Sequence, residues 1–155
     1  MKTVSIRFGF ATNSSSYHSL VQGTPTWSNL SRQEIIEKYL ANQNPSFRPA
    51  YGEGMEDISE MDDIVTYALY SLVLEDLDSY AYYGRDHNIS EYEFELLTKG
   101  FSSDIIELVR KLEPYFGEVY VSDDTSSAYR FADKFKSKEE AFWNFIYGVS
   151  CITEG

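Results

Sequence analysis

Histidine, the usual general base, is scarce in this chain, and the spacing of its serines matches no hydrolase pattern. Neutral imidazole is the usual proton acceptor at about pH 7, and the chain has only two histidines, His18 and His87. A serine, histidine and acid set can be assembled from the serines at 14–16, a histidine and Asp123 or Asp124. The Gly-x-Ser-x-Gly turn that exposes a nucleophilic serine is missing, however. We expect no catalytic residue and lean against an enzyme.

Metal binding has equally little support. Adjacent acids such as Asp62 and Asp63 supply oxygen ligands, but no calcium-binding loop with its glycine and terminal glutamate is present. Neighbouring residues point to opposite faces of a strand and lie about 100° apart on a helix, so such a pair does not converge on an ion. Cys151 is the only cysteine, which excludes a disulfide within the chain and a site of several thiolates. We expect no metal, no cofactor and a reducing, cytoplasmic location.

One N-terminal segment is rich in hydroxyl and amide groups. Its polar and cationic members are Arg7, Asn13, Ser14, Ser15, Ser16 and His18. Such side chains and exposed backbone N–H groups can hold a phosphate. The Gly-x-x-x-x-Gly-Lys pattern of a nucleotide-binding loop is missing. A small enzyme or sensor for a phosphate or nucleotide ligand is therefore an alternative, and a polar hairpin turn is the simpler interpretation.

This segment resembles the opening of a scattered group of uncharacterised bacterial and phage proteins. The shared pattern is an arginine, a Gly-Phe pair and an asparagine followed by serines, here Arg7, Gly9, Phe10, Asn13 and the serines after it. The resemblance ends at about Leu20 of 155 residues and carries no known activity. It implies a bacterial or phage origin.

Two hairpins are expected from the pattern of polar and apolar residues. Val4, Ile6 and Phe8 alternate with polar or small residues, and a second strand follows the serines over residues 17–22. Residues 118–122 and 128–132 flank a polar stretch and suggest another pair of strands.

Helix signals predict about five helices. Capping boxes, in which a serine and a glutamate three residues later satisfy the first free amides, begin at Ser31, Ser90 and Ser137. A further helix runs from 103 or 104 to Leu112, and the last helix includes Val149 on its apolar face. The longest pattern covers about residues 56–80. The fold class is α+β: a small antiparallel sheet built from two hairpins with the helices packed on it, in one domain over residues 1–155.

The charge is acidic and unevenly distributed. The chain has 25 Asp and Glu against 13 Lys and Arg, a net charge of −12. Residues 50–84 contain no Lys or Arg, and their acids are Glu53, Glu56, Asp57, Glu60, Asp62, Asp63, Glu75, Asp76 and Asp78. Direct nucleic-acid binding needs a cationic surface and is excluded, whereas a local negative field attracts a basic protein. No apolar run reaches the ~20 residues of a membrane span.

One side of the longest predicted helix combines carboxylates with tyrosines. Glu56, Glu60, Asp63, Tyr67 and Tyr70 align opposite its apolar face. Tyrosine offers a large, stiff contact area and is a favoured interface anchor. These five residues are the expected partner-binding surface, provided that no second layer of structure covers them.

We therefore expect a non-enzymatic binding or inhibitor protein of phage or bacterial origin, which docks this helix on a basic, nucleic-acid-binding surface of a host protein. Small acidic phage proteins that inhibit CRISPR effectors or restriction enzymes place carboxylates where phosphates normally bind. That comparison is with a functional class and not a sequence match. A structural or assembly protein that forms a homo-oligomer is a third hypothesis, and the oligomeric state is not predicted.

Overall fold

Strands from both ends of the chain pair into one sheet. The computed structural model describes residues 4–6, 18–42, 50–51, 57–74, 90–115, 120–121 and 127–154. β2 (His18–Gln22) is the central strand and pairs antiparallel with β1 (Val4–Ile6) and β5 (Val149–Glu154). The β1–β2 pairing is that of the expected N-terminal hairpin, whose connection lies outside the described residues.

The second expected hairpin is wrong. Residues 127–132 instead form the helix α6 (Ser127–Ala132), which packs on α7 (Lys138–Gly148). Ala128 and Phe131 are both buried and lie three residues apart, the spacing of one helix face. The short strand β4 (Tyr120–Val121) pairs in parallel with β3 (Ala50–Tyr51) instead. The chain is nevertheless an α+β protein at the level of class.

Three helices begin at their predicted caps. They are α1 (Arg32–Ala41), α4 (Glu91–Leu97) and α7. The capping boxes of α1 and α4 are complete, whereas at α7 only the serine hydroxyl accepts its amide. α5 (Ser103–Leu112) also matches its predicted bounds and continues into the 3-10 turn η3 (Glu113–Tyr115).

α7 ends at Gly148, so the prediction that Val149 lies on its apolar face is wrong. Val149 starts β5, in which β-branched residues are common.

The longest predicted helix begins later than expected. α2 (Met61–Ala68) starts after Glu60 and continues into the π-helical turn η1 (Leu69–Val73). Ile58 is held in an extended conformation, because it exchanges two backbone hydrogen bonds of 2.9 and 2.8 Å with Ile152 of β5. This bridge to the sheet prevents residues 57–60 from joining the helix. Residues 75–80 of the prediction lie outside the described part of the chain.

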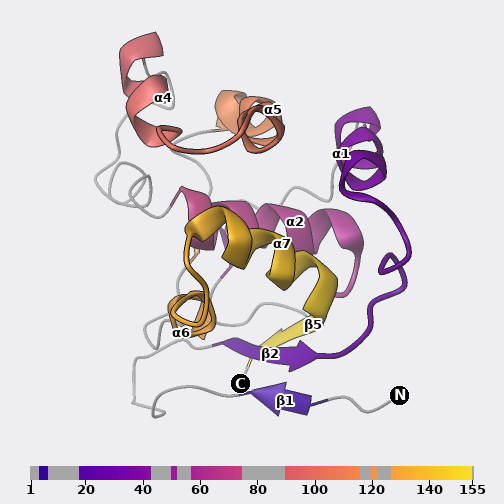
Figure 1. The fold of residues 1–155 in the computed structure, drawn as a ribbon. Coiled ribbons are helices and arrows are strands. Elements are labelled where there is room, and N and C mark those ends of the chain that lie inside the picture. Colours follow the sequence, from indigo (N-terminus) through magenta and orange to yellow (C-terminus); the bar gives the residue numbers. More distant parts are fainter. Residues whose placement is uncertain are drawn as a thin grey trace.

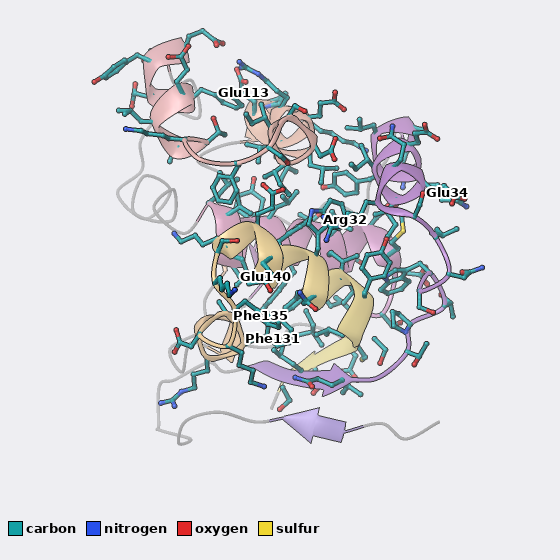
Figure 2. The ribbon with its side chains drawn as sticks, viewed as in Figure 1. Arg32, Glu34, Glu113, Phe131, Phe135 and Glu140 are labelled. Carbon is teal, nitrogen blue, oxygen red and sulfur yellow. The ribbon has the colours of Figure 1, made fainter. Side chains whose placement is uncertain are left out.

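The helices form two layers over the sheet. Figure 1 shows α2 and α7 between the strands and a second layer that contains α1 and α5. The aromatic rings of Tyr67 and Phe145 stack at 6.1 Å between α2 and α7, and Phe131 meets Phe145 edge-on at 5.2 Å. Figure 2 shows Phe131 and Phe135 at α6. Because α2 lies in the middle layer, it is covered on both sides. No helix in the described ranges is long and apolar enough to cross a membrane.

Candidate functional site

The predicted carboxylate and tyrosine face of α2 lies inside the protein. Asp63 is 3% exposed, and Tyr67 and Tyr70 are 0% exposed. The condition set for this face, that no second layer of structure covers it, is not met for these three residues. α7 packs on the helix, with Phe145 stacked on Tyr67, and Tyr39 of α1 reaches Thr66 on another side. Glu60 is exposed at the start of α2, and Glu56 lies outside the described residues.

Polar groups where α1, α2 and α5 meet are bonded to one another. The Lys111 ammonium donates to the backbone carbonyls of Tyr39 and of Asn42, the latter at 2.8 Å. The Asn42 amide in turn donates to the Asp62 carboxylate. Burial lowers the pKa of Lys111, while the negative charge of Asp62 acts in the opposite direction. This cluster satisfies the free carbonyls at the end of α1, which is a structural role.

The Tyr39 hydroxyl is also paired inside the protein. It lies 2.8 Å from the hydroxyl oxygen of Thr66, and the Thr66 hydroxyl donates to the Asp62 carbonyl at 2.8 Å. The single hydroxyl proton of Thr66 is thereby used, so Tyr39 is the donor in its own bond. Burial raises the pKa of Tyr39 well above its ordinary value. We assign this pair to the packing of α1 on α2.

A different helix presents large apolar side chains to solvent. Tyr92 and Leu96 of α4 are 69% and 54% exposed, and the third such residue in the described ranges is Leu40 of α1, at 38%. Tyr92 and Leu96 are four residues apart and therefore lie on the same side of α4. Glu95 is exposed on that side as well. We call Tyr92, Glu95 and Leu96 the α4 face.

The opposite side of α4 contacts α5. Phe94 is 2% exposed, and the Arg110 guanidinium lies 3.6 Å from the centre of its ring. Arg110 also donates to both carboxylate oxygens of Glu91, at 2.9 and 2.8 Å, and to Glu113 at 2.5 Å. The bonds from Arg110 to Glu91 lower the pKa of the Glu91 carboxyl. They hold α4 in an orientation that points Tyr92 and Leu96 away from the core.

The carboxylates of α4 have different tasks. Glu91 pairs with Arg110, and Glu93 completes the capping box with Ser90. Glu95 has no hydrogen bond or ion pair with the described part of the chain. The α4 face therefore offers an apolar pair with one available carboxylate beside it.

The catalytic and ligand alternatives gain little from the described residues. Arg7 and Asn13 to Ser16 lie outside them, as do His87, Asp123 and Asp124. His18 lies in β2, opposite Glu154 of β5. No group of three His, Cys, Asp or Glu residues that could hold a metal ion occurs within the ranges described. Burial raises the pKa of Cys151, which disfavours a reactive thiolate.

The sequence did contain a signal for the α4 face. Tyr92 and Leu96 are spaced by one helical turn, and Phe94 between them points to the other side. The capping box at Ser90 identified the helix, but nothing local showed which of its apolar residues α5 would cover.

Comparisons with protein-family models, curated proteins and solved structures found no match. The proposed function therefore rests on the exposure, charge and packing described above.

Proposed function

We propose that this chain is a non-enzymatic protein-binding protein that docks the α4 face on a basic, partly apolar surface of another protein. The observation that carries the proposal is the exposure of Tyr92 and Leu96 on one side of α4, whose other side places Phe94 against Arg110 of α5. Exposed large hydrophobic residues that lie together mark interaction sites more often than scattered ones do. Tyrosine in particular anchors interfaces.

The charge of the chain indicates what kind of surface fits. Glu95 lies next to the apolar pair, and the whole chain carries −12. Complementary charge at the edge of an interface speeds association and excludes wrong partners more than it adds affinity. The partner surface is therefore apolar where it meets Tyr92 and Leu96, and cationic around them.

The finer form of the proposal is the one expected from composition. The partner is a nucleic-acid-binding protein of the host cytoplasm, and a chain of phage or bacterial origin inhibits it by placing carboxylates where phosphates bind. The net charge supports this form, and the α4 face supplies the apolar anchor.

Docking between two copies is the less favoured use of the α4 face. A twofold interface brings the same patch of both copies together. It would place Glu95 and its neighbours near their own counterparts, and like charges repel.

The proposal is tested by affinity capture from the bacterial host with three immobilised proteins: the unmodified chain, the double variant Tyr92→Ala and Leu96→Ala, and the control Leu40→Ala. Leu40 is the matched control because it is also exposed but lies on α1. Quantitative mass spectrometry should find a protein that the unmodified chain and Leu40→Ala retain equally and that the double variant loses.

All three substitutions replace exposed residues, so they should change the stability by no more than about 0.5 kcal/mol. Equal retention by all three proteins contradicts docking through α4. Light scattering measures the molar mass. If the molar mass doubles as the protein concentration is raised, and the double variant does not show this doubling, the homo-oligomer hypothesis replaces the proposal.

A further inference from the structure

A cleft of about 630 Å³ opens next to α4, where the first turns of α1 and α7 approach the turn between α4 and α5. Leu96, Leu97 and Phe101 form an apolar wall, and Trp143 of α7 also lines the cleft. The volume lies within the ~300–1,000 Å³ of small-molecule sites, which combine apolar walls with a few polar groups.

Three cationic side chains from different elements line this cleft. They are Arg32 at the start of α1, Lys99 after α4 and Lys138 at the start of α7. The Arg32 guanidinium lies 5.1 Å from the centre of the Trp143 ring, and Figure 2 shows Arg32 between α1 and α7. In a chain of net charge −12, neither Arg32 nor Lys99 forms an ion pair with the described residues.

Two carboxylates line the same cleft, but each bonds to a backbone amide. Glu139 accepts from the N–H of Ser102, just before α5, at 2.8 Å. Glu140 accepts from the N–H of Lys136 at 3.3 Å. The first turns of α1 and α7 add partial positive charge of their own. The amide bonds orient the two carboxylates but leave their charge in place, so the lining holds three cations and two anions, and Arg32 and Lys99 have no carboxylate partner among the described residues.

We infer that this cleft binds a small organic anion, a phosphate or carboxylate carried on a flat apolar body. The anionic group lies between Arg32 and Lys99, and the apolar body lies against Leu97 and Phe101. The guanidinium forms paired hydrogen bonds with either anion, and the lysine ammonium adds a compact charge. The site is separate from the docking function, although Leu96 borders both.

The test is a titration of the full chain, followed by amide and indole NMR shifts, with phenyl phosphate, benzoate, inorganic phosphate and benzyl alcohol. Phenyl phosphate or benzoate should bind saturably and shift the amides of Lys99, Gly100 and Phe101 together with the Trp143 indole. Inorganic phosphate and benzyl alcohol each lack half of the ligand and should bind more weakly. Stronger binding by phenyl phosphate assigns a phosphate ligand, and stronger binding by benzoate assigns a carboxylate.

Charge variants separate a site from general attraction. Lys99→Glu should weaken binding by about tenfold or more, as expected for a lost charged hydrogen bond, and Arg32→Gln should do the same. Lys134→Glu makes the same charge change at an exposed residue outside the cleft and should have little effect. Circular dichroism checks that each variant is folded.

Three results would overturn the site: shifts scattered over the surface, equal weakening by Lys99→Glu and Lys134→Glu, or benzyl alcohol that binds as well as the anions. Binding that survives Tyr92→Ala supports a site independent of docking, so either proposal can fail alone.

Discussion

Tyr39 and Lys111 show how single residues bring polar groups into the interior. The Tyr39 hydroxyl is bonded to Thr66, and the Lys111 ammonium covers the last carbonyls of α1 and lies 4.4 Å from the centre of the Tyr39 ring. A buried polar group that lacks a partner costs far more than a bonded one contributes. Both residues therefore fix how α1 sits on α2 and α5.

The raised pKa of Tyr39 predicts a loss of stability in alkali. An unfolded tyrosine ionises at about pH 10, whereas the buried Tyr39 keeps its proton at higher pH. Above about pH 10 the unfolded state therefore binds fewer protons than the folded state. The contribution of Tyr39 to the free energy of unfolding is complete below about pH 10 and falls by up to about 1.4 kcal/mol per pH unit above it.

Urea unfolding of Tyr39→Phe checks this. At neutral pH the variant should be about 1 kcal/mol less stable, because the hydrogen bond to Thr66 is lost. Above about pH 10 its free energy of unfolding should fall less steeply than that of the unmodified chain. If the free energy of unfolding falls with pH at the same rate in both proteins, Tyr39 ionises as readily in the folded state as in the unfolded one.

Elements defined by local chemistry could be predicted, and elements defined by distant partners could not. The serine caps at Ser31 and Ser90 act within one helical turn, so the sequence alone identifies α1 and α4. The extended conformation of Ile58 depends on Ile152, which is remote in the chain. α6 likewise depends on packing against α7. Without knowledge of this contact, the sequence of residues 128–132 fits a strand as well as it fits a helix.

The turn between α4 and α5 depends on the backbone freedom of Gly100. Its φ is +89°, a region that residues with a side chain rarely adopt, although a Cβ atom there would meet no other atom within 4 Å. Gly100→Ala should therefore destabilise the protein by about 1 kcal/mol through backbone strain alone.

Gly148 is the matched control for this substitution. It lies at the end of α7, has no positive φ, and also has open space around the position of a Cβ. Gly148→Ala should leave the protein as stable or increase its stability by up to about 1 kcal/mol. Thermal unfolding of both variants measures the difference. If Gly100→Ala is as stable as Gly148→Ala, the positive φ at position 100 causes no strain.

On the scale of the whole molecule, layering decides which residues meet solvent. The periodicity of α2 correctly identifies an apolar face through Ile64, Val65 and Ala68. The opposite face is also covered, so Tyr67 and Tyr70 belong to the core. One helix pattern cannot reveal the number of layers around it, because that number is set by elements far along the chain. α4 lies at the periphery (Figure 1), and the α4 face with Tyr92 and Leu96 therefore remains exposed.

The position of the proposed docking surface follows from this layering. Glu60 belongs to the face first expected from the sequence, and Glu95 belongs to the α4 face; both are exposed glutamates. Glu60→Lys and Glu95→Lys make the same charge change at these two places. They therefore distinguish the two locations without disturbing the core.

Calorimetric titration of the protein captured through α4 is the most direct test. Glu95→Lys should weaken binding by several-fold and more at low salt, because exposed charges are screened beyond about 10 Å at 0.1 M salt. The double variant Tyr92→Ala and Leu96→Ala should weaken it by about 30-fold or more, the loss of a central anchor. Glu60→Lys and Leu40→Ala should bind as the unmodified chain does. Docking through α4 would be contradicted if the double variant bound with unchanged affinity. It would also be contradicted if Glu60→Lys lost as much affinity as the double variant.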